Sequence, residues 1–106
     1  MTSALPARMQ ALVARFFEGR GETDPALRRA VAERAKGAES DGIPAAIEGY
    51  VEKVALHAYR ITDEDIVALR AAGYSEDAIF EITLSAALGA GLVRMERGLA
   101  ALRGDL

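Results

Sequence analysis

The sequence predicts an all-α protein of about five helices. Apolar residues recur every three or four positions along most of the 106 residues, and no segment alternates apolar and polar residues as a half-buried strand does. Good N-cap residues, Asp24, Thr62 and Ser75, precede three of the periodic segments. We therefore expect one helical domain over residues 1–106.

An N-terminal helical pair is expected over about residues 5–36, with a break at 19–24. Its first helix begins at Pro6, and one stripe carries the apolar side chains of Leu5, Met9, Leu12, Val13, Phe16 and Phe17. Its second helix begins at Pro25, with Asp24 as the N-cap. The apolar line of this second helix is thin and charged residues surround it, so we expect the helix to lie on the surface.

Two further helices follow the loop at residues 37–42. The first begins at Pro44, and its predicted buried face consists of Ile47, Tyr50, Val51, Val54 and Ala58. The second begins after Thr62 and ends at Gly73, a residue that tolerates a left-handed backbone. Its first turn is acidic, as is the first turn of the helix that follows, and the helix dipole explains both acidic runs without a bound cation.

The longest predicted helix covers residues 76–102 and indicates self-assembly. Its middle, residues 82–93, is apolar or small on every side, and a monomer of this length has little core in which to bury it. Small residues stand four apart in three pairs: Ser85 and Gly89, Ala86 and Ala90, and Ala87 and Gly91. Glycine in a helix costs about 1 kcal/mol relative to alanine. We therefore predict a homo-oligomer whose interface uses this helix.

Composition excludes several classes of function. The chain has no cysteine and one histidine, which leaves no thiolate or multi-histidine metal site, and we expect no metal or cofactor. A net charge of −3 disfavours nucleic acid as a partner. The N-terminus lacks the pattern of a signal peptide, and the longest uncharged stretch, 12 residues, falls short of the roughly 20 that span a membrane. A cytoplasmic protein without a membrane partner is expected.

Three side chains are candidates for acid–base chemistry. His57, the only histidine, lies at the edge of the predicted buried face of the helix that starts at Pro44. It is either a partly buried histidine with a hydrogen-bonded ring or a general base near Tyr59, Arg60 or a carboxylate. Glu81 enters an apolar helix and is either a polar-face residue or a buried group that needs a partner. Asp65 is the other candidate carboxylate.

Residues 58–92 resemble the helical core of the carboxymuconolactone decarboxylase and alkylhydroperoxidase D-like family. The resemblance is carried by LRAAGYSEDAIFEITLSAALGAG, residues 69–91, in which a helix ending in Ala-Gly is followed by a turn, acidic residues, an isoleucine, a glutamate and small apolar residues. The matching positions are Gly73, Glu76, Asp77, Ile79 and Glu81. The resemblance covers about a third of the chain and implies a family-like core over about residues 44–103.

The same resemblance implies where reactive residues would stand. Peroxidase members carry a Cys-x-x-Cys-x-x-x-His motif, whose cysteine positions correspond to Ala58 and Ile61 and whose histidine position corresponds to Asp65. All three motif residues are absent, so the family's thiol chemistry cannot occur in this chain. A retained ligand pocket would be walled by Ala58, Ile61 and Asp65, with His57, Tyr59 and Glu81 as further candidates. Family members are commonly trimers or hexamers.

Three hypotheses of function follow. The first is a non-peroxidase member of this family that acts as a binding or structural module, assembles as a trimer or hexamer, and binds at most a small molecule. The second is an acid–base enzyme of the lactone decarboxylase type, in which His57 works with Asp65 or Glu81. The third is a subunit of a hetero-complex whose partner supplies the catalytic residues.

Overall fold

The structure, a computed structural model, describes residues 5–104 and confirms the all-α prediction. The described residues form no strand. They form five α-helices and one 3₁₀ helix: α1 (Ala7–Glu18), α2 (Pro25–Ala35), α3 (Ala45–Leu56), η1 (Ala58–Arg60), α4 (Asp63–Ala71) and α5 (Glu76–Leu102). The bounds of α5 coincide with those expected for the long C-terminal helix.

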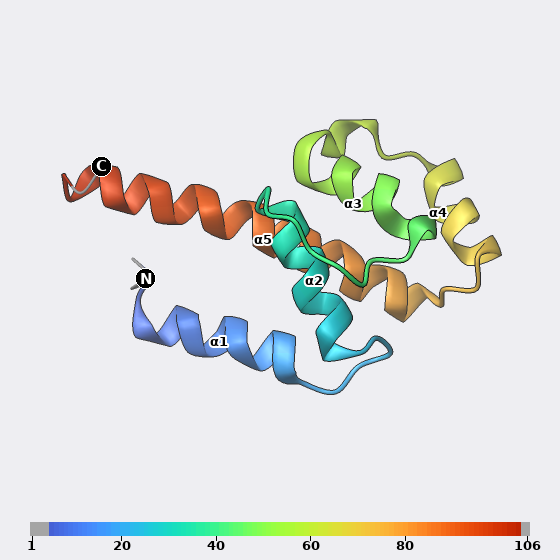
Figure 1. Cartoon of the computed structure of the whole chain (residues 1–106), viewed down its shortest axis with the longest axis horizontal. Helices are drawn as coiled ribbons and strands as arrows, with labels where there is room; N and C mark the ends of the chain where they lie inside the picture. Colours follow the sequence, from blue (N-terminus) through green and yellow to red (C-terminus); the bar gives the residue numbers. More distant parts are fainter. Residues whose placement is uncertain (1–4, 105–106) are drawn as a thin grey trace.

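The long helix α5 organises the fold. Figure 1 shows α2 crossing α5 near its middle, while α3 and α4 gather beside its N-terminal half and α1 lies beside its C-terminal half. The most extensive packing between helices is that of α2 on α5, followed by that of α3 on α5. The core consists of Val31, Ala35, Ile47, Tyr50, Val51, Ala55, Leu69, Ile79, Ile82, Ala86 and Ala90.

Local capping explains where the helices begin. Asp24 Oδ1 accepts a hydrogen bond from Ala26 N at 2.8 Å, and Ser75 Oγ accepts one from Ala78 N at 3.1 Å. Thr62 and Asp65 form a capping box at the start of α4. Gly73 follows α4 with φ +102°, a conformation that glycine adopts without steric strain. These contacts confirm the starts expected at Asp24, Thr62 and Ser75.

The expectation that the second helix lies on the surface is wrong. One face of α2 is buried against α5, with Arg28, Val31, Ala32 and Ala35 among its buried residues. The physical reason is the small size of the facing residues, because a Cβ added at Gly89 would lie 2.8 Å from Ala32 Cα. A thin apolar line is therefore enough to bury α2 when the opposing helix allows the backbones to approach closely.

The predicted buried face of the third helix is wrong at its last member, Ala58, which lies beyond the end of α3. Ile47, Tyr50 and Val51 are buried as expected, but α3 ends at Leu56. His57 has an extended φ of −143° and redirects the chain, so Ala58 lies in η1 and is exposed. The expected burial of Ala58 beside Val54 is therefore wrong.

Helix α1 and the C-terminal half of α5 pack less tightly than the rest of the molecule. No residue of α1 is buried, and Leu12 on that helix is exposed. The C-terminal half of α5 extends away from α3 and α4 (Figure 1). As a result the molecule is elongated, 47 × 29 × 22 Å, with a radius of gyration of 14.4 Å compared with about 13 Å for a compact chain of this length.

By length and composition alone, α5 suffices to cross a membrane, a test that core helices of soluble proteins also meet. In this fold one face of the helix packs on α2 and α3, and eight of its residues are buried there. Of the most apolar window of α5, 39% is buried inside the fold.

Candidate functional site

Asp65 holds together the start of α4 and the end of α3. Its carboxylate accepts hydrogen bonds from Lys53 Nζ at 2.8 and 3.0 Å and from Thr62 N at 2.9 Å. The Lys53 ammonium, followed by the Thr62 amide, holds the pKa of Asp65 below its ordinary value. The carboxylate is therefore ionised at neutral pH, and its oxygens are occupied by hydrogen bonds from the N-cap residue Thr62 and from the Lys53 ammonium.

His57 stands at the C-terminal end of α3. Its amide donates to Lys53 O at 2.7 Å, and its carbonyl oxygen accepts from Arg60 N at 2.8 Å. The half-buried imidazole meets the ring of Tyr59 edge-on, with the ring centroids 6.1 Å apart. Within residues 5–104, no hydrogen bond or ion pair joins this imidazole to Asp65 or Glu81.

Three of the residues expected to wall a ligand pocket lie in and after η1. Ala58 and Tyr59 are exposed, and the guanidinium of Arg60 stands over the Tyr59 ring at 5.6 Å. Ile61 is partly buried and packs against the core. These side chains therefore do not face one enclosed space, because two of them point to solvent and the third packs inward.

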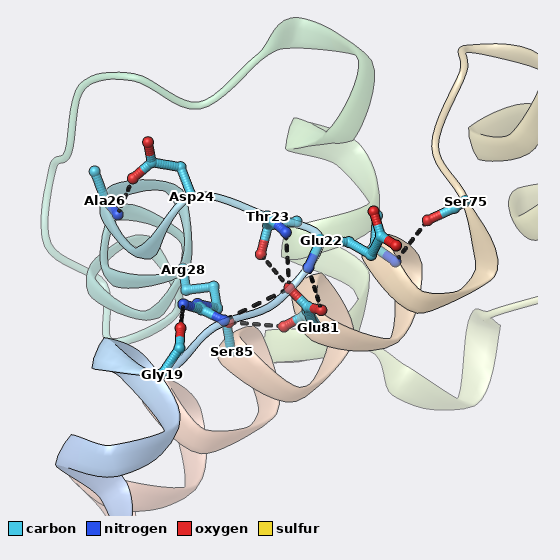
Figure 2. Close-up of polar contacts among 10 residues, drawn as sticks. Gly19, Glu22, Thr23, Asp24, Ala26, Arg28, Ser75, Glu81 and Ser85 are labelled. Carbon is cyan, nitrogen blue, oxygen red and sulfur yellow. Dashed lines mark hydrogen bonds and ion pairs between the residues drawn. The ribbon is translucent and has the colours of Figure 1, made fainter.

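Glu81 is held by three hydrogen bonds and one ion pair. It projects from α5 toward the chain segment between α1 and α2 (Figure 2). Its carboxylate accepts hydrogen bonds from Thr23 Oγ1 at 2.5 Å, Thr23 N at 2.9 Å and Glu22 N at 2.8 Å. Gly21 lies directly above it, since a Cβ there would be 2.6 Å from Glu81 Oε1. Of the two readings of Glu81, the structure supports the buried group with partners.

Arg28 supplies the charge that opposes Glu81. Its guanidinium Nη1 lies 3.6 Å from Glu81 Oε1, and the two side chains are only 2% and 13% exposed. The same guanidinium donates to Gly19 O and lies 5.8 Å from the centroid of the Phe16 ring. Its Nε is buried without a hydrogen-bond partner among the described residues. Arg28 and Glu81 thus connect α1, α2 and α5 through the segment at residues 19–24.

The protonation state of Glu81 follows from these contacts. Burial by itself raises the pKa of Glu81, but the hydrogen bonds from Thr23 and Glu22 and the charge of Arg28 outweigh it. The pKa of Glu81 therefore lies below its ordinary value. An ionised carboxylate that already accepts three hydrogen bonds has little capacity to accept a proton at neutral pH, so the geometry supports a structural role for Glu81.

The three candidate side chains thus belong to three separate sets of contacts. Asp65 contacts Lys53 and Thr62, His57 contacts Tyr59, and Glu81 contacts the 19–24 segment and Arg28. The described residues contain no group of three His, Asp or Glu side chains suited to hold a metal ion.

A groove that sequence reasoning did not predict lies between α1, α2 and α5. Its volume is about 520 Å³. The apolar side chains of its wall include Val13 and Phe17 from α1, Ala32 from α2 and Leu92 from α5. Polar groups stand among them, and the full lining does not include His57, Asp65 or Glu81. This groove is therefore separate from the residues predicted from the sequence.

Sequence reasoning missed Thr23, Arg28 and Lys53, which hold the two candidate carboxylates. One signal pointed to Arg28, because it stands three and seven residues before Val31 and Ala35 on one face of α2. A basic residue on a buried helix face requires an acidic partner, and Glu81 was already a carboxylate in need of one. The pairing itself spans 53 positions in the chain and depends on the tertiary fold.

Comparison with protein-family models, with curated proteins and with solved structures gives no match to this chain.

Proposed function

We propose that this protein is a non-enzymatic assembly module of the carboxymuconolactone decarboxylase-like type, in which α5 joins copies of the chain in the cytoplasm. The proposal combines the resemblance of residues 69–91 with the absence of cysteine, which removes the thiol chemistry of the peroxidase members. The hairpin of α4 and α5, with Gly73 at its turn, is compatible with that resemblance.

The observation that carries the proposal is the uncovered apolar side of α5. Phe80 is 64% exposed and Leu102 is 83% exposed, and Met95 between them is exposed as well. An apolar surface of this kind on a soluble chain indicates a site of association. The acid–base alternative has weaker support, because Asp65 and Glu81 are engaged with cations and His57 contacts neither of them.

Size-exclusion chromatography with light scattering tests this proposal. The expected mass at micromolar concentration is a multiple of the 11.3 kDa chain mass. Ala87→Glu places a charge in the middle of the uncovered side and should yield monomer, whereas Ala68→Glu makes the same change on the exposed surface of α4 and should leave the mass unchanged. Wild-type protein that remains monomeric throughout contradicts the proposal, and assembly only with a second protein would favour the hetero-complex.

A further inference from the structure

The uncovered side of α5 is a single straight stripe. Residues three and four positions apart along a helix share a face. The open stripe, as we call it, consists of Phe80, Leu84, Ala87, Gly91, Met95, Gly98 and Leu102. It contains no charged residue over its length of about 33 Å. All of its members are exposed except Leu84, which is partly buried.

Packing within the chain does not require glycine at two positions of the open stripe. A Cβ added at Gly91 or Gly98 would meet nothing within 4 Å. Each of these glycines still costs the helix about 1 kcal/mol relative to alanine. Gly89, only two residues away, has a clear internal purpose because it lets Ala32 approach. The small residues of the open stripe therefore leave room for a neighbour that approaches from outside.

The order of large and small residues indicates which neighbour fits. We propose that two copies of α5 pack antiparallel through the open stripe, with Gly91 of each chain at the two-fold axis. In this register Phe80 faces Leu102 of the other copy, while Leu84 and Met95 face the small residues Gly98 and Ala87. Large side chains thus meet small ones at the Leu84–Gly98 and Met95–Ala87 positions, and the two large residues Phe80 and Leu102 meet at the ends of the contact. Parallel pairing sets Leu84 against Leu84 and Gly98 against Gly98, which alternates crowding with gaps.

Charge distribution along α5 favours the same orientation. Its first turn carries Glu76 and Asp77, and its C-terminal part carries Arg94, Glu96 and Arg97, which leaves a net charge of +1 there. Antiparallel pairing brings the acidic part of one helix beside the basic part of the other, whereas parallel pairing aligns like charges. The opposed helix dipoles add to this preference.

The surface area of the chain fits a second copy. The protein exposes 6973 Å². A compact monomer of 11.3 kDa exposes about 5700 Å², so this chain exposes roughly 1300 Å² more. A standard interface covers about 800 Å² on each partner. The excess is thus sufficient for one contact of ordinary size.

This inference rests on the proposed assembly through α5 and specifies its symmetry. A contact across a two-fold axis is isologous, so each copy uses the same stripe. Such a contact can form a dimer, or join two trimers into a hexamer, but it does not occur within a cyclic trimer. Of the trimer and hexamer implied by the family resemblance, it is therefore compatible with the hexamer.

Disulfide cross-linking tests the register, because the chain has no cysteine of its own. Gly91→Cys should form disulfide dimers on mild oxidation. Ala87→Cys and Met95→Cys should each cross-link poorly alone, since the two copies of either residue lie about 12 Å apart along the axis. A mixture of the two variants should give a mixed disulfide dimer, because Ala87 and Met95 face each other. Ala68→Cys on α4 reports random collision, and circular dichroism confirms that each variant is folded.

The outcomes separate this inference from the assembly proposal. Strong self-cross-linking of both Ala87→Cys and Met95→Cys would show parallel pairing, which overturns the register but leaves assembly through α5 intact. Oligomers in which the three stripe variants, alone or mixed, cross-link no better than Ala68→Cys would place the interface elsewhere and overturn both. A monomer that sediments with phosphatidylcholine vesicles would also overturn both, because the open stripe would then contact lipid.

Discussion

The two sides of α5 carry similar residue types, but one side makes close contacts within the chain and the other is exposed to solvent. On the side that faces α2, Gly89 stands where an added Cβ would lie 2.8 Å from Ala32 Cα, and Glu81 meets a buried arginine. On the opposite side, Gly91 has no neighbour within 4 Å of an added Cβ, and Phe80 is exposed. The first side is covered within one chain, and the second side is exposed.

This difference shows that small residues in an apolar helix can have two causes: close packing within the chain, or a surface left open to another molecule. Ser85, Ala86, Gly89 and Ala90 are buried inside the chain, so they explain the close packing of α2 and α3 and say nothing about assembly. Only Ala87 and Gly91, of the three pairs, remain exposed. The argument for an oligomer therefore depends on fewer residues than the sequence indicates, but those residues form one continuous stripe.

The largest effect is expected on the closed side, at Glu81. Glu81→Gln keeps the shape of the side chain but removes the charge that opposes the buried Arg28, and breaking such a buried pair costs about 3 kcal/mol. Urea denaturation at neutral pH measures this loss. Glu18→Gln removes the carboxylate of an exposed ion pair with Arg29 and should cost less than about 1 kcal/mol. Equal losses in the two variants would contradict the buried pairing.

The pH dependence of stability provides a second readout of the Glu81 variant. Because the pKa of Glu81 is lowered by folding, its contribution is present above the ordinary glutamate pKa and is lost as the pH falls through the folded value. Wild-type protein should lose stability from about pH 5 downward. Asp65, whose pKa is also lowered, acts in the same direction and remains in the variant. The variant should therefore show a shallower decline, and identical declines would contradict this assignment.

A somewhat smaller effect is expected at Gly89. Gly89→Ala places a Cβ against the backbone of Ala32, which no side-chain rotation relieves, so α2 must move away from α5. We expect a loss of about 2 kcal/mol in the free energy of unfolding, after the better helix propensity of alanine is included. Urea denaturation at fixed protein concentration measures the loss. Unchanged or increased stability would show that α2 and α5 are not in close contact.

The helix ends could be predicted from sequence because their causes are local. Asp24 with Pro25, Ser75 and Gly73 determine helix boundaries through contacts within a few residues. The burial of α2 could not be predicted in this way. It depends on the backbone approach at Gly89, which is 57 positions from Ala32 and becomes visible only in the fold.

For the candidate site, the sequence predicted individual residues but not the partners that each of them contacts. Sequence offered a buried and partnered environment as one of two settings for Glu81, and the N-cap at Thr62 placed Asp65 in the first turn of a helix. It did not assign Arg28 or Lys53 as their partners, because each pairing depends on how helices cross. It also placed His57 within a helix, whereas the chain turns at that residue.

The smallest effect is expected on the open side, and its sign should depend on protein concentration. At submicromolar concentration, where the chain is dissociated, Gly91→Ala should raise the free energy of unfolding by up to about 1 kcal/mol, because alanine favours the helix and its Cβ meets no atom. At high concentration the same Cβ stands at the two-fold axis and should weaken association. Urea denaturation across a concentration series measures both effects. A gain in stability that is equal at every concentration would show that Gly91 faces solvent in the assembled protein, which would leave the closed side of α5 as its only packed face.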